Sequence, residues 1–196
     1  MSTRLSIIIL LVLSIFSFVS AQEKNEAFNT LAIGINAVKD FHENSFQKSW
    51  EPQLGIEGYF NTPFYLGKLH TGITYCAFGT KVTGYPDFKL FLVYLQWDYE
   101  FELTKELIIA LGGRAGLSEM RFNENDIVAD KNLLNETEFT AGMIARLSYE
   151  VIKDFRINLS SHYLTIFTYP QMNSLFIGAG ISKTFSTPGW LKEFLK

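Results

Sequence analysis

Residues 91–103 alternate between apolar and polar side chains almost without interruption. The odd-numbered positions are all apolar or aromatic: Phe91, Val93, Leu95, Trp97, Tyr99, Phe101 and Leu103. The even-numbered positions become acidic along the segment and end in Asp98, Glu100 and Glu102. Successive side chains of a β-strand point to opposite faces, so this pattern predicts a strand with one apolar and one polar face. Its length suits a tilted strand that crosses a lipid bilayer.

The same alternation recurs along the chain. Eight segments carry it: residues 30–38, 53–60, 65–78, 91–103, 107–118, 139–151, 155–167 and 174–185. After residue 21 the sequence has no apolar run close to the roughly 20 residues of a membrane-spanning helix. The chain is nevertheless 47% hydrophobic. Apolar residues in alternation rather than in blocks are typical of a transmembrane β-barrel, so we predict an all-β, eight-stranded antiparallel transmembrane β-barrel.

The connections between these segments alternate between short and long. The short connections are residues 61–63, 104–106 and 152–154, and the long ones are residues 40–52, 79–89, 119–138 and 168–173. Outer-membrane barrels have short periplasmic turns and longer extracellular loops. We therefore expect both termini on the periplasmic side and the long connections outside the cell.

The first residues have the features of an export signal. Arg4 precedes an uncharged apolar run over residues 5–19, and the small residues Ser20 and Ala21 precede Gln22. This predicts a cleavable secretory signal peptide over residues 1–21 and Sec-type export. The barrel would then cover residues 22–185. Residues 186–196 would form a short periplasmic amphipathic tail, with an interfacial helix over residues 190–196.

Composition narrows the classes of function. A formal net charge of −3 gives no basic footprint for nucleic acid. The only cysteine, Cys76, cannot form an intramolecular disulfide. The acidic stretch over residues 123–126 lacks the glycine and terminal glutamate of a calcium-binding EF-hand loop. We therefore assign no cofactor and no metal ion.

The polar face of the predicted strands is rich in Gly, Ala, Ser and Thr and carries charges of both signs. Such a face suits the crowded lumen of an eight-stranded barrel. We predict a polar network in the lumen, formed by Asp98, Arg114, Arg146, Glu150 and Arg156. The apolar face would then contact lipid. The alternative is a secreted, lipocalin-like ligand-binding barrel, which would have its apolar side chains inside.

Register supports the inward placement of these charges. If Val151 pairs with Phe155, Glu150 lies directly opposite Arg156. If Leu103 pairs with Leu107, Asp98 lies opposite Gly112 and diagonal to Arg114. Opposite charges on neighbouring strands stabilise a sheet, and charges inside a narrow barrel must be paired.

With its signal, its eight dyad-repeat strands, its alternating connection lengths and Phe185 closing the last strand, the chain resembles the small eight-stranded outer-membrane β-barrels, of the OmpX and OmpA transmembrane-domain type. The resemblance implies a Gram-negative outer membrane, folding by the barrel-assembly machinery, contact with outer-membrane lipid and lipopolysaccharide, and a monomer. It implies little about the task, because this scaffold serves adhesins, structural proteins and lipid-modifying enzymes.

Two hypotheses about function follow. The first is a structural, adhesion or recognition role through the extracellular loops, not a wide pore, with an unidentified extracellular ligand. Loops on a rigid scaffold concentrate binding residues, and the candidates are Phe41, His42, Trp50, Tyr85, Arg121 and Phe122. The second is a lipid A deacylase or acyltransferase that uses Ser160, His162 and Glu150. Ser160 and His162 have lumen parity, which favours hydrogen-bonded filling over catalysis.

Overall fold

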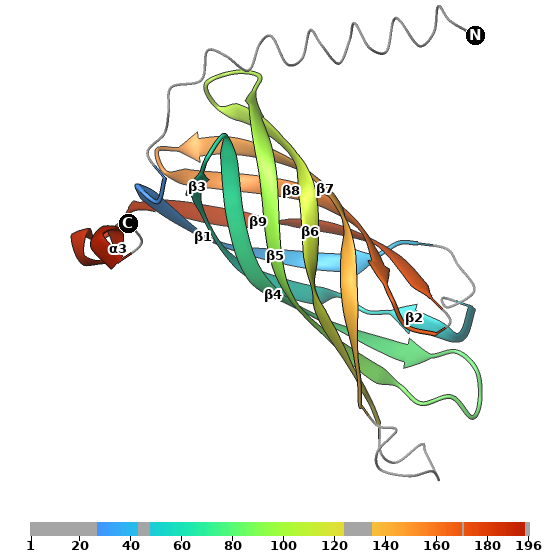
Figure 1. Ribbon diagram of the computed structural model, residues 1–196. Helices are drawn as coiled ribbons and strands as arrows, with labels where there is room; N and C mark the ends of the chain where they lie inside the picture. Colours follow the sequence, from blue (N-terminus) through green and yellow to red (C-terminus); the bar gives the residue numbers. More distant parts are fainter. Residues whose placement is uncertain (1–26, 43–47, 124–134, 170, 195–196) are drawn as a thin grey trace, which may run out of the picture.

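The computed structural model describes residues 27–42, 48–123, 135–169 and 171–194. In this part of the chain, eight long strands form a closed antiparallel barrel (Figure 1). They are β1 (Thr30–Asp40), β3 (Gly55–Phe64), β4 (Gly67–Thr80), β5 (Phe88–Glu102), β6 (Leu107–Phe122), β7 (Asn135–Ile152), β8 (Phe155–Ile166) and β9 (Met172–Ser186). The β1–β9 ladder closes the barrel. The predicted eight-stranded architecture is confirmed, whereas the signal predicted over residues 1–21 lies outside the described residues.

A further strand of three residues, β2 (Trp50–Pro52), pairs with the end of β4, where Trp50 lies opposite Thr80. Both β2 and β3 pair with the same strand, β4. Gln53 and Leu54 separate them. β2 therefore extends β3 beyond a break and adds no new position around the barrel.

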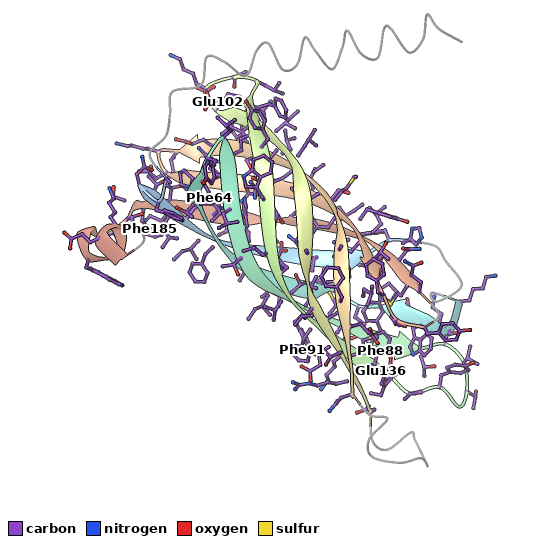
Figure 2. The ribbon with its side chains drawn as sticks, viewed as in Figure 1. Phe64, Phe88, Phe91, Glu102, Glu136 and Phe185 are labelled. Carbon is purple, nitrogen blue, oxygen red and sulfur yellow. The ribbon has the colours of Figure 1, made fainter. Side chains whose placement is uncertain are left out.

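The two ends of the barrel differ. At one end, here called the turn end, residues 65–66, 103–106 and 153–154 join the strands, and β1 begins there (Figure 1). At the other, the loop end, the connections are residues 41–49, 81–87, 123–134 and 167–171. Figure 2 labels Phe64, Glu102 and Phe185 near the turn end, and Phe88, Phe91 and Glu136 near the loop end. The predicted alternation of connection lengths is confirmed.

Two short turns differ in detail from the prediction. Residues 61–63 belong to β3, and the turn is formed by Tyr65, at φ 53°, and Leu66. Pro63 is tolerated because it occupies the next-to-last position of the strand. In the hairpin between β7 and β8, Ile152 rather than Val151 pairs with Phe155. A bulge between Glu150 and Ile152 absorbs the extra residue.

The apolar face points outward. On β5, the outward side chains of Val93, Leu95 and Trp97 are 42–56% exposed, whereas Gln96 and Asp98 are buried. Aromatic contacts lie toward both ends of this outer surface, between Tyr75 and Phe91 at the loop end and between Tyr99 and Phe101 at the turn end. This is the arrangement of a transmembrane barrel, and it is the reverse of the lipocalin-like alternative.

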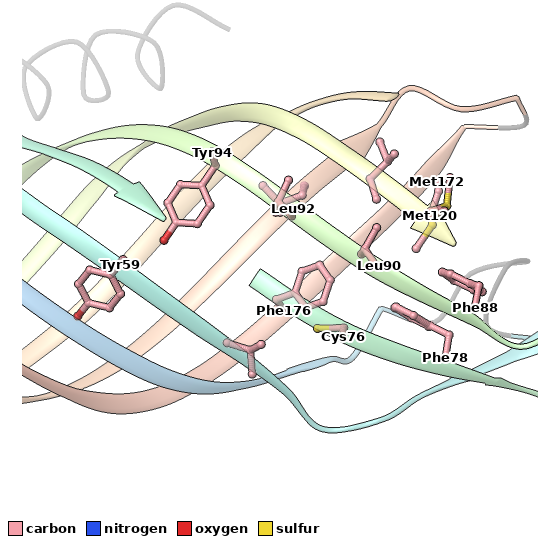
Figure 3. Close-up of a cluster of buried hydrophobic side chains, with 13 residues drawn as sticks. Tyr59, Cys76, Phe78, Phe88, Leu90, Leu92, Tyr94, Met120, Met172 and Phe176 are labelled. Atoms are coloured by element: carbon pink, nitrogen blue, oxygen red, sulfur yellow. The ribbon is translucent and has the colours of Figure 1, made fainter. Parts of the chain in front are cut away.

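The lumen has two layers, and only one of them is polar. The half near the loop end is filled mainly by apolar side chains (Figure 3): Val38, Tyr59, Cys76, Phe78, Phe88, Leu90, Leu92, Tyr94, Met120, Leu164, Ile166, Met172 and Phe176. The polar side chains of the predicted network therefore lie in the other half, nearer the turn end. Leu90 and Leu92 have the same inward parity on β5 as Gln96 and Asp98.

After β9 the chain forms a short helix, α3 (Gly189–Phe194). The backbone nitrogen of Thr187 donates to the carbonyl of Asn29 (3.1 Å), which ties the end of β9 to the start of β1. Trp190 is exposed. Among the described residues there is no helix with the length and apolar character needed to cross a membrane. The helical part of the predicted tail is present, and its interfacial position stays a prediction.

Candidate functional site

The polar layer of the lumen is organised by Asp98, which is fully buried on β5. Its carboxylate accepts hydrogen bonds from Gln96 Nε2 (2.9 Å) and Arg146 Nη2 (3.0 Å). His70 Nε2 lies 3.1 Å from it. A buried carboxylate without such partners would be strongly destabilising, so these three contacts make the charge tolerable.

Arg146 extends this cluster toward the turn end. Its Nη2 lies 3.4 Å from Glu100 Oε1, and Glu100 Oε2 lies 2.9 Å from Lys68 Nζ. The five side chains Lys68, Glu100, Arg146, Asp98 and His70 therefore form one chain of contacts between β4, β5 and β7. Arg114 and Glu57 form the core of a second cluster.

Arg114 on β6 reaches across the lumen to β3, where its Nη2 lies 2.8 Å from Glu57 Oε1. It also donates to Gln96 Oε1 through Nε (3.0 Å) and Nη2 (2.7 Å). Its guanidinium carbon lies 3.5 Å from the centre of the Tyr94 ring. Asn36 Nδ2 donates to the other oxygen of Glu57 (2.6 Å). Gln96 thus links the two clusters.

The structure therefore places Asp98, Arg114 and Arg146 together, but it does not form the expected contact between Asp98 and Arg114. The predicted register is correct, because Asp98 lies opposite Gly112. Long side chains, however, cross the narrow lumen to strands that are distant in the sheet. Glu150 and Arg156 pair as expected at 3.3 Å, but at the turn end, with side chains 29% and 22% exposed.

Sequence reasoning missed Glu57, His70 and Gln96 as members of the network. All three are buried and inward. The alternation of inward and outward positions that assigned Asp98 to the lumen also assigns these three residues to it. This alternation in the sequence could have identified them.

The three candidate catalytic residues do not assemble. Ser160 and His162 are buried in the lumen, and Ser160 Oγ donates to the carbonyl of Gly178 (3.5 Å). The carboxylate beside His162 Nδ1 is Glu57, at 3.9 Å, because Glu150 is held at the turn end by Arg156.

The cavity beside Ser160 and His162 is too small for a substrate. Glu57, His70, Arg114 and Arg146 also line it, and its volume is about 10 Å³. This is no more than one water molecule needs, so an acyl chain cannot reach these groups. Among the described residues no cluster of His, Cys, Asp or Glu could hold a metal ion.

The loop-end candidates divide into packed and exposed side chains. Trp50 Nε1 donates to the carbonyl of Pro86 (2.9 Å), and its ring contacts Tyr85 and Phe88 edge-on. Phe122 packs on Phe88, with ring centroids 5.5 Å apart. These contacts stiffen the connection over residues 81–87 and the extension of β6 beyond the barrel.

Other candidates remain accessible at the loop end. Phe41 and Tyr85 are 54% and 48% exposed. His42 contacts the ring of Tyr163 edge-on. Arg121 is exposed and forms two hydrogen bonds to the carboxylate of Glu119 (2.8 and 3.1 Å). Donation from Arg121 lowers the pKa of Glu119.

No protein-family model matches the chain, and neither does any curated protein sequence. Several solved structures have the same fold. Neisserial surface protein A is 16% identical over 84% of this chain and 100% of its own, with a TM-score of 0.54. The fold is that of the small eight-stranded outer-membrane barrels.

A second outer-membrane barrel of this fold is the attachment invasion locus protein Ail of Yersinia pestis. Solved in complex with a heparin analogue, Ail is 11% identical over 82% of this chain and 100% of its own, with a TM-score of 0.52. Its structure in a phospholipid bilayer nanodisc gives 16% identity over 80% of this chain and 99% of its own, with a TM-score of 0.51. The eight-stranded family predicted from the sequence is confirmed at the level of the fold.

Proposed function

We propose that the protein is a closed outer-membrane barrel of a Gram-negative cell envelope that presents a recognition or adhesion surface at its loop end. In this orientation the turn end faces the periplasm and the loop end faces the outside of the cell. Sec-type export and the barrel-assembly machinery would deliver it there, and lipid and lipopolysaccharide would surround it as a monomer.

The observation that carries this proposal is the filled lumen. Two ion-pair clusters occupy one half and an apolar layer occupies the other. An eight-stranded barrel has room for little more than its own side chains. A protein whose interior is packed in this way acts through its surfaces rather than as a wide pore.

The loop end supports recognition over a purely structural role. There β6 and β7 continue past the end of β8, with Arg121 opposite Asn135. Trp50, Tyr85 and Phe88 brace the neighbouring connection. Rigid scaffolds that hold exposed aromatic side chains suit binding, because little conformational entropy is lost on contact.

Attachment of intact cells tests this proposal. Cells that express the protein should bind an extracellular-matrix or host-cell surface more than cells without it. Phe41→Ser with Tyr85→Ser should abolish the gain, because both side chains are accessible at the loop end. Tyr65→Ser is the control, since Tyr65 is even more exposed, at 79%, but lies in a turn at the opposite end. Equal attachment with and without the protein would contradict recognition and favour a structural role.

Membrane fractionation with heat-modifiable gel mobility tests the location. The unheated protein should migrate as a compact band from the outer-membrane fraction. Recovery of the mature chain in the soluble periplasmic fraction would overturn the proposal. Mass spectrometry of lipid A from cells with and without the protein tests the enzyme alternative. If the protein modifies lipid A, an acyl chain should be gained or lost, and the change should depend on His162.

A further inference from the structure

The outer surface of β4, β5, β6 and β7 changes from apolar to basic in three successive rows of outward side chains near the loop end. The innermost row is wholly apolar and exposed: Ile73, Val93, Leu117 and Phe139. The next row contains Tyr75, Phe91, Glu119 and Thr137, and the outermost contains Ala77, Lys89, Arg121 and Asn135. Neighbouring rows are about 7 Å apart along a strand. Because the strands tilt, a row does not run level with the membrane. On β4 and β5 the membrane boundary is placed near Tyr75 and Phe91, because aromatic rings favour the interface.

Lys89 and Arg121 lie directly opposite each other just beyond this boundary. Like charges in that position repel each other and destabilise a strand pair. Glu119 binds Arg121 through Nε and Nη2. The backbone of Lys89 pairs with β4 and β6, but its side-chain amine has no hydrogen-bond or ion-pair partner among the described residues. The pair thus keeps a net positive charge at the depth of lipid headgroups, where an anion would remove the repulsion.

An apolar groove lies over β1, β3, β4 and β5, and Val93 at its edge is two rows, about 14 Å along β5, below Lys89. It has a volume of about 470 Å³, and its outward lining includes Ile33, Phe60, Ile73 and Val93. The groove exists because Gly58 lies between Ile35 and Ile73 without a side chain. A Cβ added at Gly58 would meet no described atom within 4 Å. The Tyr75 and Phe91 rings, with centroids 5.1 Å apart, lie between the groove and Lys89, and the guanidinium carbon of Arg121 lies 4.8 Å from the centre of the Phe91 ring.

We infer that this surface binds one membrane lipid with a phosphorylated headgroup from the leaflet at the loop end. The phosphate lies between Lys89 Nζ and the guanidinium of Arg121, and an acyl chain passes along Tyr75 into the groove at Gly58. The charge of Lys89 and Arg121 matches the phosphate, and Tyr75 with the apolar row below matches an acyl chain. The inference rests on the proposed membrane location and adds a specific lipid site to it.

Native mass spectrometry of the detergent-solubilised barrel, with diphosphoryl lipid A as the probe, tests the site. The wild-type protein should retain one lipid. Lys89→Gln with Arg121→Gln should weaken retention about tenfold or more, because both contacts to the phosphate are lost. Lys105→Gln with Lys183→Gln is the matched control, since it removes two cations near the turn end and should leave retention unchanged. Unchanged retention in the Lys89 and Arg121 variant would overturn the inference.

Three further arms separate headgroup, acyl chain and free anion. Lipid A without phosphates should bind the wild-type protein as weakly as the double variant binds the phosphorylated form. If the wild-type protein binds both forms of lipid A equally well, the phosphate contact is refuted. Gly58→Leu fills the groove and should also weaken retention, and no change would refute the acyl-chain position. Millimolar inorganic phosphate should not displace the lipid, whereas displacement would mean a site for a free anion. Each variant must first show the compact unheated gel band, so loss of lipid is distinguished from failure of the barrel itself.

Discussion

Arg146 Nη2 lies 3.0 Å from Asp98 Oδ2, although their strands, β7 and β5, are separated in the sheet by β6. Both side chains are buried, and Asp98 is fully inaccessible to solvent. The contact is made through the lumen rather than along the sheet. Because an unpaired charge in such an interior is strongly unfavourable, the pair constrains which substitutions the barrel tolerates.

Arg146→Met should lower the free energy of unfolding by about 3–5 kcal/mol, because it leaves Asp98 buried without its arginine partner, whereas Glu100 keeps Lys68. Arg156→Met is the control, since Glu150 and Arg156 are partly exposed. Its effect should be about 1 kcal/mol or less. Urea unfolding in micelles, followed by the heat-modifiable gel band, measures both. Equal losses would mean that the Arg146 contacts contribute no more than an exposed pair.

The partner of Arg114 can be identified by double-mutant cycles. Arg114→Met and Glu57→Gln should be coupled by about 1–3 kcal/mol, because their side chains are in direct contact at 2.8 Å. Arg114→Met and Asp98→Asn should be coupled less, because Gln96 separates them. A stronger coupling of Arg114 with Asp98 would restore the pairing expected from the sequence.

The sequence was sufficient for the eight strands, their faces and most of the pairing of neighbours, although it missed the end of β3 and the bulge before Ile152. The dyad pattern placed Val93 and Leu95 outside and Asp98 inside, and hairpin register placed Asp98 opposite Gly112 and Glu150 opposite Arg156. These are local consequences of a two-residue period and a short turn.

Contacts across the lumen could not be predicted in the same way. The approach of Arg114 to Glu57 depends on the tilt and stagger of strands that are far apart in the sequence. The approach also depends on how far each long side chain extends across the lumen. The pattern of residues along one strand contains no information about strand tilt and stagger or about this extension. For the aromatic side chains at the loop end, the sequence left recognition and mutual packing equally open. Trp50, expected in a loop, lies in β2 and packs on Tyr85 and Phe88.

Two adjacent glycines provide a test of packing between strands. A Cβ at Gly112 would overlap the Trp97 carbonyl and the backbone of Asp98, whereas the nearest atom to a Cβ at Gly113 is the Gly142 carbonyl oxygen, at 3.8 Å. Gly112→Ala should therefore lower the free energy of unfolding by about 1–3 kcal/mol. Gly113→Ala should leave it nearly unchanged. Urea unfolding of the two variants under one set of conditions makes the comparison, and similar losses would contradict the described approach of β5 to β6.

The pKa of Glu119 reports the contact with Arg121 outside the apolar band. Donation from Arg121 lowers this pKa in the folded protein. The contact therefore adds stability above the unfolded pKa, and this stability is lost as the pH falls through the folded value. Arg121→Gln should return the pKa toward its ordinary value, whereas Lys89→Gln should change it less. Side-chain NMR titration measures each, and an unchanged pKa in Arg121→Gln would contradict the contact.

Because its lumen is filled, the barrel should not conduct ions. The polar and apolar layers lie in series along the barrel, so an ion would have to displace both the Asp98–Arg146 contact and the cluster that includes Leu90 and Leu92. Pure protein in planar bilayers should show no steady single-channel current. Leu90→Ala with Leu92→Ala should stay silent as well, because the ion pairs still block the other half. Arg146→Ala should likewise stay silent behind the intact apolar layer. Steady large currents from the wild-type protein would mean that the layers open together, and the proposal of a surface function would lose its basis.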